Sequence, residues 1–201
     1  MHRRGQRLAV ALGAVAAAAA VAVPALASPG PEGVPIPNGL ELAPPADTAS
    51  IGPVDGIKCQ PREQVLYHIH AHLTVFVDGH ARQIPAGIGI ADPQAQATPD
   101  GPFVVAGVCF SWLHTHAADG IIHIESPTQR TYTLGDFFDL WGQPLGGGRV
   151  SSARGSITAY VNGKVWSGSP RSIPLKRHAQ IQLDVGRPLV APVKITSWNG
   201  L

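Results

Sequence analysis

The chain has 201 residues, in which 15 Lys and Arg nearly balance 13 Asp and Glu, and it contains nine histidines. This balance provides no strong positive field, so nucleic acid is not expected among its partners. The only methionine is Met1, which excludes a copper(I) carrier built on thioether ligands. A copper site in this chain would therefore use imidazole and hold copper(II).

Residues 1–27 have the pattern of an export signal. Three arginines near the start precede an apolar, alanine-rich stretch at 8–23, and the A-L-A triplet at 25–27 supplies the small residues that signal peptidase requires. Cleavage would remove three arginines and no acid, which changes the formal charge from +2 to −1. The pattern predicts a secreted or extracytoplasmic protein of the cell envelope. The alternative is an uncleaved membrane anchor, since residues 8–27 are about long enough to span a bilayer.

Three regions are expected after the leader. Residues 28–58 are rich in Pro and Gly and indicate a linker, 59–190 a β-domain that carries the histidines, and 191–201 a C-terminal tail. An even number of cysteines outside the cytoplasm favours a disulfide between Cys59 and Cys109. Thiolate ligation of a metal is the alternative, because each cysteine precedes a histidine cluster.

Strand patterns dominate the expected β-domain. Alternating residues at 65–77 end at the tight-turn dipeptide Asp78-Gly79, and residues 81–90 are expected to return as the second strand of a hairpin. A second hairpin is expected around Asn162-Gly163, followed by an alternating strand at 178–186.

One short helix interrupts this pattern. Thr133 can cap it, Gly142 and Pro144 can end it, and the apolar residues between them follow helical spacing. The expected fold is therefore mostly β, a sandwich or small barrel of antiparallel hairpins with one short helix that packs on the sheet.

Residues 113–125, LHTHAADGIIHIE, indicate a metal site. If Asp119-Gly120 is a two-residue turn, His116 lies opposite His123 and His114 lies opposite Glu125. Side chains alternate along a strand, so all four point to one face of the hairpin. Opposed Cβ atoms are about 4.5–5.5 Å apart, close enough for imidazoles to share one ion. Asp119 itself is interpreted as a turn residue.

A second histidine cluster, His68, His70 and His72 in YHIHAHLTVFVDG, has the same spacing of two. These side chains also share one face, which favours metal ligation over the solvated face of an edge strand. Whether this strand joins the first cluster or forms a site of its own is left open by the sequence. His80 and His178 belong to neither cluster. His80 is expected at the surface, and His178 is expected to be structural or exposed rather than a ligand.

Three imidazoles and an open position suit copper(II) or zinc. Glu125 has three possible roles: a fourth ligand, a partner that orients an imidazole, or a general base acting on metal-bound water. The metal ligands expected from the sequence are His68, His70, His72, His114, His116, His123 and Glu125.

The strings YHIHAHLTVFVDG and CFSWLHTHAADGIIHIESPTQRTYTLGDFFDLWGQPL resemble those of exported, histidine-rich bacterial proteins with no assigned function. The resemblance covers about residues 57–145 and implies no mechanism. The H-x-H pairs are also similar to those of cupins, but the glutamate expected after such a pair is absent here. The arrangement of His114, His116 and His123 is similar to the zinc ligands of carbonic anhydrases built on a β-sheet.

Taken together, these patterns predict an extracytoplasmic protein that binds copper(II) or zinc through a histidine-rich β-face. Two other classes stay open: a secreted metalloenzyme, acting through metal-bound hydroxide or as a copper oxidoreductase, and a cell-surface domain that a metal only stabilises.

Overall fold

The central strand β2 (Tyr67–Val77) has two faces of different chemistry, because its residues alternate. Ile69, Ala71, Leu73 and Val75 point into the hydrophobic core, whereas the histidines of the strand lie on the opposite face. Residues 68–72 pair with β9 (Ile121–Ser126), which brings His70 opposite His123 and His68 opposite Glu125. The two clusters that the sequence indicated therefore meet across neighbouring strands.

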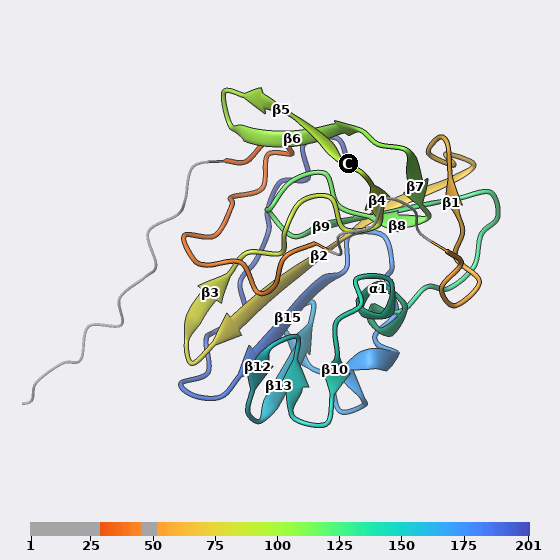
Figure 1. Cartoon of the computed structure of the whole chain (residues 1–201). Helices are drawn as coiled ribbons and strands as arrows, with labels where there is room; N and C mark the ends of the chain where they lie inside the picture. Colours follow the sequence, from red (N-terminus) through yellow and green to blue (C-terminus); the bar gives the residue numbers. More distant parts are fainter. Residues whose placement is uncertain (1–28, 46–51) are drawn as a thin grey trace, which may run out of the picture.

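A computed structural model describes residues 29–45 and 52–201 (Figure 1). The expected leader at 1–27 lies outside these residues. Within the described part of the chain, no helix is long and apolar enough to cross a membrane.

The fold is mostly β, with a seven-stranded sheet at its centre and one α-helix, as predicted. The strand order is β14-β13-β15-β2-β9-β8, and β3 pairs with β2. Only the β15–β2 pair is parallel. The described strands form open sheets, which fits the sandwich rather than the small barrel. The remaining strands of this sheet are β3 (His80–Arg82), β8 (Leu113–His114), β13 (Ile157–Val161), β14 (Lys164–Val165) and β15 (Gln180–Val185).

Smaller sheets surround the central one (Figure 1). The first has the order β1-β7-β4 and contains Cys59 and Cys109, which form the expected disulfide. The β5–β6 hairpin lies at the top of Figure 1, and its Val104 carbonyl lies 2.6 Å from His116 Nδ1. The strands are β1 (Cys59–Gln60), β4 (Ile90–Ala91), β5 (Gln94–Thr98), β6 (Gly101–Ala106), β7 (Cys109–Ser111), β10 (Leu145–Gly146), β11 (Arg149–Val150) and β12 (Ala153–Arg154); a 3-10 helix spans Pro170–Ser172.

Helix α1 (Leu134–Leu140) forms where the sequence predicts it. Thr133 accepts a hydrogen bond from the backbone of Asp136, and the Asp136 carboxylate accepts one from the backbone of Thr133, which makes a capping box. Phe137, Phe138 and the following Trp141 are fully buried in the core. The helix is therefore a lid on the apolar face of the sheet.

Two of the three Asx-Gly hairpins are confirmed. Asp78-Gly79 and Asn162-Gly163 both have two positive φ angles, 50° then 78° in each case. They connect β2 to β3 and β13 to β14 as two-residue turns.

The turn predicted at Asp119-Gly120 is wrong, and the register differs by two residues. His114, not His116, lies opposite His123, and only Gly120 of the pair has a positive φ, 89°. The backbones of Thr115 and His116 hydrogen bond to Ile88 and Val104 instead of β9. A shift of two preserves the side-chain face, so the histidines still point to one side.

The segments expected to be a linker and a tail pack on the domain. Val34 and Leu42 are buried, the backbone N–H of Leu42 donates to the Gln83 carbonyl, and the backbone N–H of Gln83 donates to the Leu40 carbonyl. At the other end, the side chains of Gln180 and Gln182 accept hydrogen bonds from the backbone of residues 193–195. The N-terminal arm (residues 29–45) also reaches the histidine face, where Glu32 contacts His123.

Candidate metal centre

Four donor atoms converge where β2 faces β9. His68 Nε2 lies 3.1 Å from His70 Nε2, which lies 3.1 Å from His123 Nδ1. Glu125 Oε1 closes the ring, at 3.1 Å from His123 Nδ1 and 3.0 Å from His68 Nε2. We call these four residues the strand group. A tetrahedral zinc ion with bonds of about 2.0–2.1 Å separates its donor atoms by about 3.3 Å, so the observed spacing is close to that of a coordination shell.

Hydrogen bonds alone do not account for this ring of contacts. Each imidazole nitrogen carries either one proton or one lone pair, so it can donate once or accept once. Under this limit, no placement of protons turns more than two of the four contacts into ordinary hydrogen bonds. The other two contacts then have no proton of their own, whereas a cation held by the four atoms would satisfy all of them.

A second pair of imidazoles lies beside the strand group. His114 Nδ1 lies 2.8 Å from the Ser111 carbonyl, and His116 Nδ1 lies 2.6 Å from the Val104 carbonyl. A carbonyl can only accept, so each Nδ1 carries a proton, and in the neutral form of each imidazole Nε2 carries a lone pair. The two Nε2 atoms are 3.1 Å apart. Backbone-fixed imidazoles with converging lone pairs are the usual arrangement of metal-binding histidines.

His123 lies between two carboxylates that satisfy both of its nitrogens. Its Nε2 is 2.6 Å from Glu32 Oε1, and its Nδ1 is 3.1 Å from Glu125 Oε1. Burial, the largest influence, lowers the pKa of His123, but the hydrogen bonds and charges of Glu125 and Glu32 outweigh it and raise the pKa to about 9. Without a metal, this imidazole is therefore protonated at neutral pH.

Two carboxylates of the site were missed in the sequence. Glu32 comes from the N-terminal arm and is buried at 5 % relative exposure. Glu63 lies just before β2, and its Oε1 is 3.3 Å from His116 Nε2. Glu63 follows Cys59 closely in the chain, so its nearness to the β7 side of the site could have been inferred from the disulfide. Glu32 gave no signal, because only the tertiary packing of the arm brings it there.

Of the seven predicted ligands, only His72 joins neither group. Its Nε2 lies 2.7 Å from the Asp119 carbonyl and its Nδ1 lies 3.3 Å from Thr74 Oγ1, so both nitrogens have partners. His72 thus links β2 to the turn before β9. Gly120 in that turn is needed for a close approach, since a Cβ there would lie 2.3 Å from the Leu73 carbonyl oxygen.

His80 and His178, which were not expected to be ligands, lie outside the metal centre. His80 is exposed on β3. His178 stacks on Trp198 at 4.4 Å between ring centroids, and its Nε2 lies 2.7 Å from the carbonyl of the C-terminal Leu201. His178 therefore supports the tail, and His80 is the better neutral control for mutagenesis.

No protein-family model, curated protein or solved structure matches the chain. What the site can do is therefore judged from its own geometry.

The centre is buried and opens to solvent at one side. The side chains of His114, His116, His123 and Glu125 are between 0 % and 8 % exposed, whereas those of His68 and Glu63 are 40 % and 38 % exposed. The rings of Phe103 and Phe110 pack against His116 and His114 and form an apolar wall. His68 and Glu63 are therefore the exposed members of the centre, whereas the rest of the shell is protected from water.

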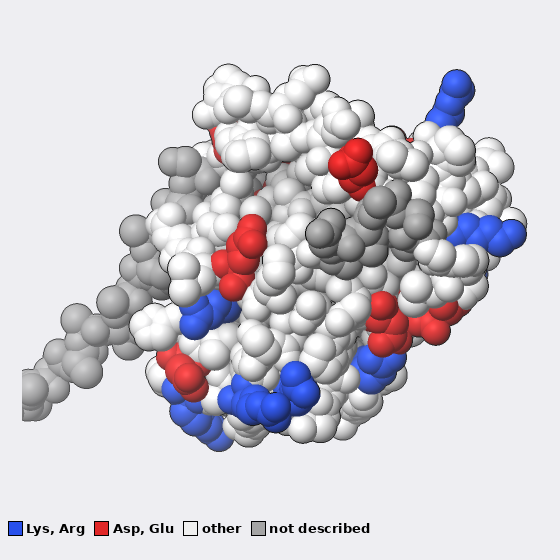
Figure 2. All heavy atoms as spheres, viewed as in Figure 1, with Lys and Arg blue, Asp and Glu red and all other residues white. Residues whose placement is uncertain are grey.

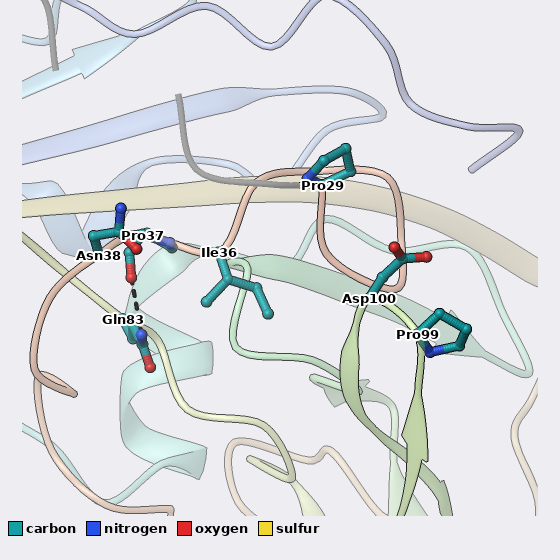
Figure 3. A pocket seen from close by; sticks show the side chains of 7 residues that line it. All are labelled: Pro29, Ile36, Pro37, Asn38, Gln83, Pro99 and Asp100. Atoms are coloured by element: carbon teal, nitrogen blue, oxygen red, sulfur yellow. Dashed lines mark hydrogen bonds between the residues drawn. The ribbon is translucent and has the colours of Figure 1, made fainter. Parts of the chain in front are cut away.

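A separate pocket of about 270 Å³ lies between the N-terminal arm and the β5–β6 turn (Figure 3). Pro29, Ile36 and Asp100 are among its lining residues, and Gln83 donates a hydrogen bond to the Pro37 carbonyl beside it. None of the histidines lines this pocket. On the face that Figure 2 shows, Lys and Arg are interspersed with Asp and Glu and form no continuous basic band among the described residues.

Burial keeps several groups of this face neutral. It lowers the pKa of His72 to about 4 and that of His70 to about 3, and it lowers the pKa of His114 well below the usual range. Burial, and then the charge of Glu32, raises the pKa of Asp119 to about 8. The metal-free site therefore holds neutral imidazoles at His70, His72 and His114 beside a protonated His123.

These shifts predict that the metal-free protein is most stable near pH 6.5. Below that pH the unfolded chain binds protons at His70, His72 and His114, whereas the folded chain does not. The folded chain binds one extra proton at Asp119, so the unfolded chain still binds about two more protons than the folded chain. Above it, folded His123 and Asp119 retain protons that the unfolded chain has lost. Each net proton changes the free energy of unfolding by about 1.4 kcal/mol per pH unit, so we expect losses of about 2 kcal/mol per unit on both sides.

Urea unfolding of chelator-treated protein between pH 5 and 8 measures this profile. A His123→Gln variant should lose part of the alkaline slope and keep the acid slope. A stability that rises steadily from pH 6.5 to 8 would contradict the raised pKa of His123.

Proposed function

We propose that this protein binds copper(II) or zinc outside the cytoplasm, through its buried histidine and carboxylate groups. The observation that carries the proposal is the pair of imidazoles at His114 and His116. Backbone carbonyls fix both rings, and their Nε2 atoms face each other at 3.1 Å. In neutral imidazoles such lone pairs repel each other, and a metal ion bound by both nitrogens would remove the repulsion. Imidazole with a few carboxylates is the donor set that zinc and copper(II) accept.

The proposed location has two supports. A disulfide between Cys59 and Cys109 suits an oxidising compartment. The pattern of residues 1–27 is that of an exported protein. Binding is favoured over catalysis for the strand group, because its four protein donors already complete a tetrahedral shell and leave no open position for a substrate.

Metal affinity after replacement of His116 tests the proposal. We expect His116→Ala to weaken zinc and copper(II) binding at least about tenfold, since changes even to residues that only orient metal ligands typically cost 10- to 100-fold. Copper(II) should bind the parent more tightly than zinc, following the usual order of divalent ions. Isothermal titration calorimetry of the purified protein at pH 7.5, with competing chelators where binding is tight, measures both effects.

His80→Ala is the matched control, because His80 is an exposed histidine in neither group. It should bind both metals as the parent does. Circular dichroism checks that His116→Ala keeps the fold. If the parent binds neither ion, or His116→Ala binds as tightly as the parent, the proposed function is wrong.

A further inference from the structure

The histidine face offers more donors than one ion can use. Seven side chains present a ligand atom there: the four of the strand group, His114, His116 and Glu63. Zinc sites in proteins are almost always four-coordinate and expand to five at most in reactions. A single ion would leave at least two of these buried or half-buried donors without a role.

The donors also separate into two sets in space. His68, His70, His123 and Glu125 have ligand atoms within 4.8 Å of one another, and so do His114, His116 and His123. Among the described residues, neither His68 nor His70 joins a group with His114 or His116. His123 belongs to both groups. One ion with bonds of about 2.0–2.1 Å holds its donor atoms no more than about 4.2 Å apart, so it cannot bind His68 and His70 together with His114 and His116.

Each set of donors shows separate evidence for a bound ion. In the strand group, at most two of four close contacts can be hydrogen bonds. In the other set, backbone carbonyls direct the lone pairs of His114 and His116 at each other. An ion bound by the strand group does not account for the facing Nε2 atoms of His114 and His116, and an ion bound by that pair does not account for the contacts of the strand group.

Glu125 lies between the two sets. Its Oε1 is 3.0 Å from His68 Nε2 and 3.9 Å from His114 Nε2, and together with Glu63 and His114 it forms a third group of close donors. Its second oxygen, Oε2, is buried and has no hydrogen-bond partner among the described residues. A carboxylate in this position can serve two cations.

We infer that the centre holds two metal ions, one bound by His68, His70 and His123 and the other by His114, His116 and Glu63, with the Glu125 carboxylate between them. This inference rests on the proposed function and adds the number of ions and their separate ligands.

Counting the ions tests the inference. The full chain, purified after export and stripped with a chelator, is loaded with zinc, and the ratio is measured by native mass spectrometry and elemental analysis. We expect two ions per chain for the parent and for His80→Ala. We expect one ion for the double variant His68→Ala/His70→Ala and one for His114→Ala/His116→Ala.

Copper(II) loading adds a readout that does not depend on stability. Two neighbouring copper(II) ions should show magnetic coupling in electron paramagnetic resonance, and each double variant should give the spectrum of an isolated ion. Glu63→Gln changes a half-exposed residue and should leave the fold intact, which circular dichroism checks. It should weaken only one of the two binding steps at least about tenfold.

The outcomes separate the two proposals. A parent that binds a single ion, lost in both double variants, overturns the two-ion inference and leaves metal binding standing. A parent that binds no ion overturns the proposed function itself. Equal weakening of both steps by Glu63→Gln would contradict the assignment of Glu63 to one ion.

Discussion

Metal affinity is expected to fall about tenfold for each pH unit between pH 8.5 and 6.5. The cause is His123, whose pKa is raised to about 9 between Glu32 and Glu125. Metal can bind its Nδ1 only after the proton leaves, so one proton is released for each ion bound there. Imidazoles with the ordinary pKa of about 6.5 would instead give an affinity that is nearly constant above pH 7.

Zinc titrations in buffers of different ionisation enthalpy measure both the slope and the number of protons released. Glu32→Gln is the informative variant, because it removes a carboxylate from His123 Nε2 without touching the Nδ1 side. The variant should bind metal with a flatter profile above pH 7. A parent whose affinity is constant from pH 7 to 8.5 would show that His123 is not a ligand or is not protonated in the metal-free protein.

Local rules predicted much of this fold from the sequence. The capped helix at Leu134–Leu140 and the hairpins at Asp78-Gly79 and Asn162-Gly163 depend on neighbouring residues alone, and all three are confirmed. The same rule failed at Asp119-Gly120. There the backbone of residues 115–116 finds hydrogen-bond partners at Ile88 and Val104, from a distant part of the chain, and a local pattern carries no information about such partners.

The candidate site shows the same division. Because side chains alternate along a strand, the spacing of two placed His68 and His70 on the same face of their strand, and likewise His114 and His116. A register shift of two residues leaves each side chain on the same face. The pairing of β2 with β9, which merges the clusters, is a long-range contact that the spacing does not contain. For the same reason, nothing marked Glu32 as a partner of His123, although the two are 2.6 Å apart.

Loss of the disulfide should cost the protein about 4 kcal/mol of its free energy of unfolding. Cys59 and Cys109 close a loop with a sequence separation of 50, for which the chain-entropy model gives a stabilisation of this size. That is a large part of the 5–15 kcal/mol typical of a domain. We expect Cys59→Ser/Cys109→Ser to show this loss in urea unfolding of the metal-free protein at pH 6.5.

The disulfide should also support one side of the metal centre more than the other. It joins β1, which leads to Glu63, to β7, whose Ser111 carbonyl fixes the tautomer of His114. The serine variant should therefore lose affinity at the His114 side before the strand group, whose residues lie on the paired strands β2 and β9. Reductant is the control: it should lower the stability of the parent to that of the serine variant and leave the variant unchanged. A loss below about 1 kcal/mol would mean that the pairing of β1 with β7 persists in the unfolded chain or that the loop is restrained by other contacts.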